Sequence, residues 1–265
     1  MFYRCTLSGA PHYKSTLIKA NHGFSTRLGG VSMGKYTRSM NLAFGRGDND
    51  DTVIKNFEIF AESIGANPHN GIMLGQIHSN EVLTVTKNEF GLGIYNKTDK
   101  CLDGYASNEP GALLCVRVAD CIPVLFHDEK NNVIGAVHSG WRGSVSKIST
   151  VCIDRMCNLG ADKADIHVAI GPGICGSCYT VGDDFVNTCR EILNSSICSE
   201  FISEKNGEYT ADLKKLILLT LLDAGINKEN IDVSECCTCH NPHEFFSHRY
   251  HKDNRGTMCA MISLG

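Results

Sequence analysis

The chain has 265 residues, of which 42% are hydrophobic and 20% are charged, and its formal net charge is −4. This composition is sufficient for one sizeable core and excludes a fibrous or disordered chain. The acidic balance and the lack of any lysine or arginine run argue against nucleic acid as the main partner, because phosphate backbones require clustered positive charge.

The sequence carries no sign of export or of membrane insertion. Its first residues lack the basic and apolar regions of a secretory signal, and its most apolar segment, residues 216–222, is far too short to span a bilayer. We therefore expect a cytoplasmic protein without a membrane partner. In such a protein, fourteen cysteines favour reduced thiols over a disulfide framework.

The predicted elements begin with a Gly/Ser-rich loop at residues 23–32, which contains Arg27. Its glycines allow backbone N–H groups to approach an anion, and a plain surface turn is an equally good interpretation. An amphipathic helix follows, with Asp51 as the expected N-cap and Gly65 at its end. Strand-like sequence comes next, at residues 82–86.

Residues 112–143 hold two apolar strands, predicted at 113–118 and 133–137, and each is followed by a side chain that can bind a metal. These side chains are Cys121 and His138. Catalytic groups often lie where a buried strand gives way to a loop. Ser144 is the expected cap of a helix that ends at Gly160, and the N-terminus of this helix, with Arg142, favours an anion.

The remaining sequence predicts strands at 166–170 and 257–264 and helices at 183–193 and 211–224. No internal repeat, low-complexity tract or linker interrupts the chain. We therefore expect an α+β fold, with a mixed β-sheet packed with helices, in a single domain over residues 1–265.

His78, Cys121 and His138 are candidate ligands of one metal ion. Two imidazoles and one thiolate suit Zn²⁺, and three protein ligands leave a fourth position for water or substrate, as in catalytic zinc sites. The spacing is too long for a zinc finger, so the three residues have to converge in the fold. Spacing alone does not exclude purely structural roles for them, but the polar and small residues beside them are typical of a pocket rim.

A competing hypothesis treats Cys121 as a thiol nucleophile that His138 activates. His78 discriminates between the two hypotheses, because it is necessary for a zinc site and superfluous in a catalytic dyad. Two later groups, Cys175 with Cys178 and the cysteines of residues 236–239, suggest a second, structural zinc site. We do not expect that site, because the two groups need not face each other and the core is adequate without it.

Six motifs occur in a fixed order along the chain: FSTRLGG at 24–30, QIH at 76–78, ADCIP at 119–123, AVHSGWRG at 136–143, IGPGI at 170–174 and FFSHR at 245–249. With them the chain resembles the purine nucleoside phosphorylase family, also labelled the laccase domain, multicopper polyphenol oxidase or peptidoglycan editing factor family. The resemblance implies an α+β fold similar to that of the bacterial toxin deamidases, a cysteine hydrolase-like fold. It also implies one zinc ion, held by His78, Cys121 and His138.

The resemblance further implies phosphorolysis of adenosine, inosine and methylthioadenosine, and hydrolytic deamination of adenosine. The partners would then be purine nucleosides and inorganic phosphate. For deamination, zinc lowers the pKa of a bound water towards ~7, so that hydroxide attacks the purine ring. Asp120 is the expected proton shuttle. For phosphorolysis, the expected phosphate ligands are Ser139 and the three arginines Arg27, Arg142 and Arg249.

Two alternatives remain open at this stage. The older family name implies a copper-dependent polyphenol oxidase, but a multicopper enzyme needs about ten further ligands, and this chain contains no His-x-His motif. Copper is therefore the less favoured metal. A cysteine-type hydrolase acting on peptidoglycan precursors through Cys121 and His138 is the other alternative. The sequence reveals neither the preferred nucleoside nor the oligomeric state.

Overall fold

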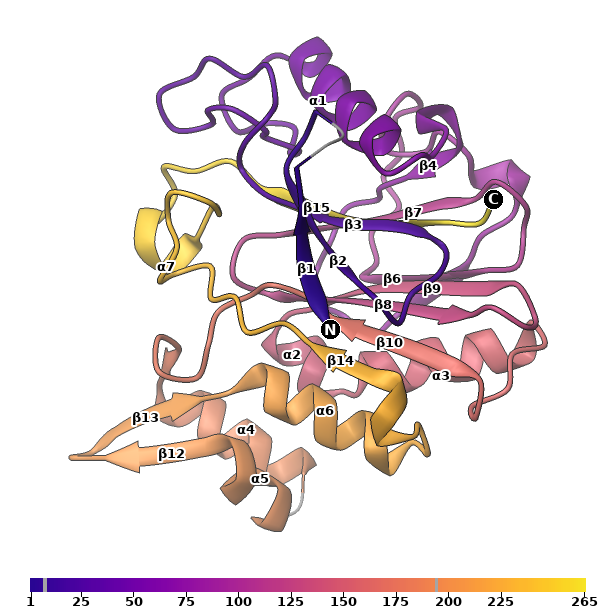
Figure 1. Cartoon of the computed structure of the whole chain (residues 1–265). Helices are drawn as coiled ribbons and strands as arrows, with labels where there is room; N and C mark the ends of the chain where they lie inside the picture. The colour runs from indigo at the N-terminus through magenta and orange to yellow at the C-terminus, as the bar shows by residue number, and fades with distance from the viewer. Residues whose placement is uncertain (7–8, 194) are drawn as a thin grey trace.

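The strands of the protein form two stacked six-stranded sheets, and helices cover both outer faces (Figure 1). The computed structural model describes residues 1–6, 9–193 and 195–265. From top to bottom in Figure 1, helix α1 (Asp50–Ser63) is followed by the first sheet, the second sheet and a helical layer. The main helices of that layer are α2 (Trp141–Val145), α3 (Ile148–Asn158) and α6 (Leu213–Asp223).

Both large sheets are mixed. The strand order in the first sheet is β1 (Phe2–Cys5), β2 (His12–Ser15), β3 (Asn21–Ser25), β15 (Met258–Ser263), β7 (Leu113–Val118) and β4 (Gly71–Ile72). The order in the second sheet is β14 (Ile231–Val233), β10 (Ile166–Ile170), β8 (Ile122–Asp128), β9 (Val133–Ser139), β6 (Gly104–Ser107) and β5 (Val82–Thr84). Three pairs are parallel, namely β4 with β7, β5 with β6 and β10 with β14.

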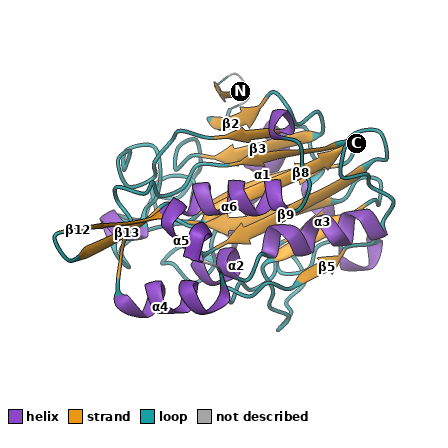
Figure 2. Cartoon of the chain, turned by 90° about the horizontal axis from the view of Figure 1, so that it is seen from below, coloured by secondary structure: helices purple, strands orange, loops and turns teal. Residues whose placement is uncertain are grey.

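A small third sheet and three further helices lie beside this sandwich (Figures 1 and 2). The sheet has the order β11 (Thr180–Val181), β13 (Glu208–Ala211) and β12 (Ile202–Lys205). The helices are α4 (Asp183–Ile192), α5 (Ser195–Phe201) and the short α7 (His248–His251). None of the helices in the described residues is long and apolar enough to cross a membrane.

The central strands are buried on both faces. Successive side chains of a strand point to opposite faces, and in β7 Leu113 and Cys115 pack in the cluster under α1. Leu114 and Val116 point the other way, into the core between the two sheets. Because both faces are covered, residues 113–116 of the strand form a continuous apolar run, which is typical of fully buried strands. This pattern explains why β7 could be predicted from the sequence.

The helical layer covers the outer face of the second sheet, as Figure 2 shows for α3 and α6. Ile148, Cys152 and Met156 lie one turn apart on α3 and share a buried cluster with Val133 and Val137 of β9. Burying such side chains contributes roughly 1.5–3 kcal/mol each. The same packing fixes β9, whose C-terminal end carries His138.

The α+β class predicted from the sequence is confirmed. That residues 1–265 form a single domain stays a prediction. Residues 21–25 form β3 where a loop was expected from Gly23 onwards. Helix α1 begins two residues earlier than predicted because Asn49, rather than Asp51, is the N-cap and accepts the capping hydrogen bond from Thr52. The prediction of one continuous helix from Ser144 to Gly160 is wrong, since Lys147 has a φ of 57° and separates α2 from α3.

Candidate functional site

His78, Cys121 and His138 lie together at one end of the central strands β8 and β9 of the second sheet. Their candidate ligand atoms are all within 4.8 Å of one another, and the two imidazole rings are 4.8 Å apart and almost perpendicular. His78 lies in the loop between β4 and β5, and Cys121 immediately precedes β8. The antiparallel register of β8 and β9 pairs Pro123 with His138. This pairing brings Cys121, just before β8, and His138, near the end of β9, to the same end of the two strands.

Asp103 organises the two histidines. Its carboxylate accepts backbone N–H groups from Ile77 (3.2 Å), His78 (3.0 Å) and Ser79 (2.7 Å). Three successive donors converge on one anion only when the backbone curls into a nest, and His78 accordingly has a φ of 61°. Asp103 also lies 2.8 Å from Nδ1 of His138. One buried carboxylate therefore fixes the conformation of the loop that carries His78 and the orientation of the His138 ring.

Two neighbouring groups, Cys121 and Asp103, determine the electrostatics of His138. Burial lowers the pKa of His138, but the Cys121 sulfur and the Asp103 carboxylate outweigh burial and raise it to about 9. Burial raises the pKa of Asp103, but hydrogen bonds from His138 and Ser79 lower it by more, so that the pKa falls to about 2. An imidazole that donates Nδ1–H to a carboxylate presents Nε2 to a metal, an arrangement found around many zinc ions.

The immediate surroundings of His78 give an independent test of that fit. Its Nδ1 is buried and has no hydrogen-bond partner among the residues that the structure describes. A buried polar nitrogen without a partner is costly. Gly140 approaches this ring so closely that a Cβ there would lie 2.3 Å from Nδ1. With two nitrogens and one sulfur, the donor set suits zinc, and a metal ion would provide the partner that the cluster lacks.

Both carboxylate oxygens of Asp120 are hydrogen-bonded in this structure. Its carboxylate accepts hydrogen bonds from the Thr238 hydroxyl (2.6 Å) and from the backbone N–H of Arg249 (2.6 Å). The backbone of Asp120 has a φ of 93°, a conformation that non-glycine residues rarely adopt. Because both carboxylate oxygens are engaged, the geometry favours holding the Cys121 loop in place over the proton shuttle predicted from the sequence.

Replacement of Thr238 by valine is expected to destabilise the protein by about 1.5–3 kcal/mol, because it leaves the buried Asp120 carboxylate without a neutral donor. Chemical denaturation measures this loss. Thr220→Val is the matched control, since the Thr220 hydroxyl bonds only to the Ile217 carbonyl of its own helix. We expect the control to lose about 1 kcal/mol or less. Equal losses in both variants would contradict the role assigned to Thr238.

One side of the cluster opens into a cavity of about 350 Å³, which we call the aromatic cavity. Its walls include the side chains of Trp141 and Tyr179, together with Ile174 and Leu213. Arg249 also lines it, with its guanidinium carbon 5.5 Å from the Tyr179 ring and one N–H bonded to the Thr180 carbonyl. Flat aromatic and apolar walls of this kind suit a planar heterocycle.

The other side opens into a second cavity of about 240 Å³, which we call the arginine cavity. Arg46, Arg117 and Arg255 line it beside the cluster. Burial lowers the pKa of Arg117 and Arg255, and the charge of Arg46 lowers both further. The Nε atoms of Arg117 and Arg255 are buried without a partner among the described residues. Three cations, two of which have an unpartnered buried donor, form a site suited to an anion.

The two cavities share a wall. His78, Ala119, Cys121 and Arg255 line both of them. The three candidate metal ligands therefore lie where an aromatic space meets a positively charged one.

Three of the predicted phosphate ligands lie elsewhere. Ser139 is fully buried, and its hydroxyl is 2.8 Å from that of Ser144. The Arg27 guanidinium donates to the Pro242 carbonyl at 2.7 Å and lies over the Phe246 ring. Arg142 is exposed and stacks on Trp141. None of the three lines either cavity, because local partners already occupy their polar groups or direct them outward. Of the predicted arginines, only Arg249 reaches the site.

Sequence reasoning missed several residues of the site. Asp103 fell in a predicted turn, and its only signal was an acidic residue preceding a glycine. Arg46, Arg117 and Arg255 carried no signal, because they are isolated cations in three distant segments. The β15–β7 register, which pairs Met258 with Val118, brings two of these segments together.

Comparisons with known proteins agree with the motifs in the sequence. A family model described as multi-copper polyphenol oxidoreductase laccase matches residues 21–265. A protein named purine nucleoside phosphorylase YlmD from Bacillus subtilis is 34% identical over 245 residues, covering 91% of this chain and 87% of its own. A purine nucleoside phosphorylase from Deinococcus radiodurans is 33% identical over 259 residues, with 98% and 95% covered.

Solved structures show the same relationship. The crystal structure of YlmD from Geobacillus stearothermophilus has a TM-score of 0.90 and 31% identity, covering 99% of this chain and 98% of that one. The crystal structure of the hypothetical protein YfiH from Bacillus licheniformis has a TM-score of 0.85, with 92% of each chain covered. The resemblance inferred from the sequence is thus confirmed, and the chain belongs to the multi-copper polyphenol oxidoreductase laccase family.

Proposed function

We propose that the protein is a zinc-dependent purine nucleoside phosphorylase that also deaminates adenosine. One observation carries this proposal: a cluster of two histidines and a cysteine lies between an aromatic cavity and an arginine cavity. The first cavity suits a purine and the second suits phosphate. The names of the relatives from Bacillus subtilis and Deinococcus radiodurans support an enzyme of this class.

In this proposal the nucleoside binds in the aromatic cavity, with its base against Trp141 and Tyr179. Adenosine, inosine and methylthioadenosine are the proposed substrates, because each combines a planar base with a ribose. The ribose would lie towards the shared wall at Cys121, so that C1′ faces the arginine cavity. Exclusion of water by the apolar walls then strengthens every polar contact with the substrate.

The proposed phosphate site is formed by Arg255 and Arg117, with Arg249 at the rim of the neighbouring cavity. During phosphorolysis a phosphate oxygen bonds to C1′ while the bond from C1′ to the purine nitrogen breaks, and the purine leaves with a proton on nitrogen. The arginines orient the nucleophile and balance its charge while positive charge develops on the ribose. For deamination, water adds to the purine C6 and ammonia leaves.

His78, Cys121 and His138 are the proposed zinc ligands, with Asp103 orienting His138. A zinc ion, when bound, supplies a Lewis acid that polarises the substrate or lowers the pKa of a water molecule. Asp120 keeps the Cys121 loop in its left-handed turn through Thr238 and Arg249. The cytoplasmic location and the similarity to toxin deamidases remain predictions from the sequence.

The decisive experiment combines metal analysis with adenosine turnover, with and without phosphate, before and after chelation. We expect zinc that depends on Cys121, adenine formed only when phosphate is present, and inosine formed without it. Both products should disappear on chelation and return with zinc. Nucleoside turnover that survives complete removal of metal would instead support the thiol mechanism at Cys121 and His138.

The family description favours a copper-dependent polyphenol oxidase as the second candidate. A blue-copper centre also uses two histidines and a cysteine. Among the described residues, however, only one further group of three or more metal-capable side chains is present, and it contains a single histidine. A multicopper centre needs about ten further ligands. Stoichiometric copper with phenol oxidation and no nucleoside turnover would favour this alternative. A hydrolase of peptidoglycan precursors would need activity without any metal.

Replacement of Arg255 by methionine is expected to raise the KM for phosphate about 10–100-fold, because it removes charge-assisted hydrogen bonds worth roughly 1.5–3 kcal/mol. Deamination uses no phosphate, so its kcat at saturating adenosine should change less than about threefold. Steady-state kinetics of both reactions measure the difference. Arg155→Met on the exposed side of α3 is the control. An unchanged phosphate KM would place the anion elsewhere.

A further inference from the structure

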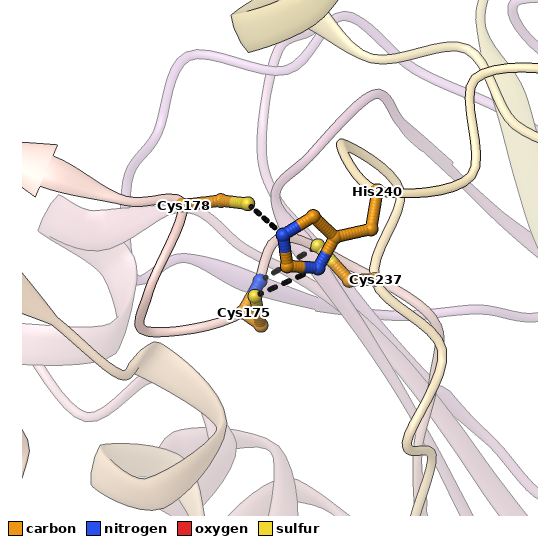
Figure 3. Close-up of side chains that lie close together, drawn as sticks. All are labelled: Cys175, Cys178, Cys237 and His240. Carbon is orange, nitrogen blue, oxygen red and sulfur yellow. Dashed lines mark hydrogen bonds between the residues drawn. The ribbon is translucent and has the colours of Figure 1, made fainter.

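Cys175, Cys178, Cys237 and His240 form a second cluster of metal-capable side chains, separate from the site described above (Figure 3). One ligand atom from each residue lies within 4.8 Å of the other three. Cys237 is buried, the other two cysteines are half-buried and His240 is exposed. The polar side of the cluster is thus reachable from solvent, while its base is part of the core.

Two distant segments meet to build this cluster. The first follows β10 and the second follows β14, and these two strands pair in parallel. The pairing continues as a bridge between Gly173 and Cys237, with the Thr238 N–H donating to the Gly173 carbonyl at 3.2 Å. The expectation that the two cysteine groups need not face each other is therefore wrong, because β14 was not predicted from the sequence.

The turn at residues 175–179 brings the side chains of Cys175 and Cys178 close to Cys237. The N–H groups of Cys178 and Tyr179 donate to the Cys175 carbonyl at 3.1 and 3.2 Å, which curls the Cys-x-x-Cys segment around its own centre. The Cys175 N–H donates to the Cys237 sulfur at 3.3 Å. A backbone donor aimed at a sulfur stabilises the thiolate, and thiolates are the form that binds zinc.

The separations between the side chains are close to those of a tetrahedral zinc site. The His240 ring lies between two sulfurs, with Nδ1 3.7 Å from Cys175 and Nε2 3.1 Å from Cys178 (Figure 3). Zinc bonds of about 2.3 Å to sulfur and 2.0–2.1 Å to nitrogen place tetrahedral ligands roughly 3.4–3.8 Å apart. A metal ion at the centre would replace the direct sulfur–nitrogen contacts, with one ring nitrogen as its ligand.

We propose that Cys175, Cys178, Cys237 and His240 bind a structural zinc ion. Three thiolates and one imidazole complete the tetrahedron, so no position remains for water or substrate. This distinguishes the second ion from the one proposed at Cys121, where the fourth position is open. The proposal does not rest on the function of the protein.

The second ion would stabilise one wall of the aromatic cavity. Ile174 and Tyr179, which line that cavity, are adjacent in sequence to Cys175 and Cys178. Thr238, which donates to Asp120, lies between Cys237 and His240. The Ile174 N–H also donates to the Asp120 carbonyl at 2.9 Å. Zinc at the cluster therefore fixes the residues that position the Cys121 loop, from a distance and without touching substrate.

Metal analysis of the full-length protein tests this proposal directly. After incubation with excess zinc and desalting, we expect two zinc ions per chain in the wild type and one in Cys178→Ser. Cys121→Ala is also expected to retain one zinc ion, and the variant that combines Cys121→Ala with Cys178→Ser is expected to retain none. The zinc that Cys121→Ala keeps separates this inference from the proposed function. A zinc content that is the same in Cys178→Ser and the wild type would overturn the second site, as would a Cys175–Cys178 disulfide in non-reducing mass spectrometry.

Ligand exchange distinguishes metal binding from a general folding role. His240→Ala should lose the second zinc ion, whereas His240→Cys should retain it, because four thiolates also form a tetrahedral zinc site. In Cys121→Ala loaded with Co²⁺, thiolate-to-cobalt charge-transfer absorption should appear and should vanish when Cys178→Ser is added. Equal zinc in His240→Ala and the wild type would remove His240 from the site.

Two controls complete the test. Cys157→Ser, on α3 and outside both clusters, should keep two zinc ions. Cys239 lies between two of the proposed ligands in sequence and its side chain contacts Cys178, but it is not one of the four clustered residues. Cys239→Ser should also keep two zinc ions. If Cys239→Ser lost a zinc ion while Cys237→Ser kept both, the assigned ligand set would be overturned.

Discussion

Cys121→Ser is expected to lower kcat/KM for both phosphorolysis and deamination by about 10³-fold or more, equivalent to roughly 4 kcal/mol of transition-state stabilisation. A serine hydroxyl is a poor zinc ligand, so the variant should also lose the zinc ion held with His78 and His138. Both reactions should fall together, because in our proposal they share this one ion. Kinetics with and without added zinc, alongside metal analysis, measure these effects.

The matched control for this prediction is Cys157→Ser, which removes a half-buried thiol outside both metal-capable clusters. It should keep full activity and full metal content. Thermal unfolding of the two variants must be compared, so that a folding defect is not mistaken for a lost ligand. If Cys121→Ser kept more than about a tenth of the wild-type activity, zinc could not be held by this residue.

Asp103→Asn is expected to weaken zinc binding at the same cluster about 10–100-fold, because the carboxylate orients the His138 ring. It should also destabilise the metal-free protein by roughly 3–5 kcal/mol, since it breaks a fully buried interaction with a histidine and three backbone donors. Zinc titration with a competing chelator measures the affinity, and urea denaturation measures the free energy of unfolding.

Asp128→Asn provides the control, because Asp128 is another fully buried carboxylate that accepts hydrogen bonds from Asn131 and Asp162. This variant should lose stability but bind zinc as the wild type does. The pH dependence gives a second check. With a folded pKa of about 2, Asp103 contributes stability above pH ~4 that disappears as the pH falls towards 2, and Asp103→Asn should lack this contribution. Equal zinc affinities in the two variants would contradict the role of Asp103.

Much of the site could be predicted because its residues follow apolar strands. His138 stands at the end of a hydrophobic run, and Cys121 follows a largely hydrophobic strand that includes Arg117. Hydrophobic runs of this length are typical of buried strands. His78 was added by the chemistry of the donor set and not by any local pattern. The resemblance to a known family, carried by the motifs around these residues, then selected among the alternatives.

The arginines and the second cluster could not be predicted because they depend on pairings between distant strands. Arg255 reaches the arginine cavity because β15 inserts between β3 and β7. Cys237 meets Cys175 only because the three residues of β14 pair with β10. A strand that short has no readable period. Ser139 shows the opposite error, since a polar residue beside a strand end proved to be fully buried against Ser144.

The position of β15 has a consequence for the order in which the site is assembled during folding. This strand is the last element in the sequence, yet it lies in the interior of the first sheet between β3 and β7. Non-local pairings of this kind form slowly, after the intervening chain has become available. Until β15 joins β7, the segment that carries Arg255 and Thr257 cannot close over Cys121. The arginine cavity is therefore completed late in folding, because Arg255 reaches it only after β15 has paired with β7.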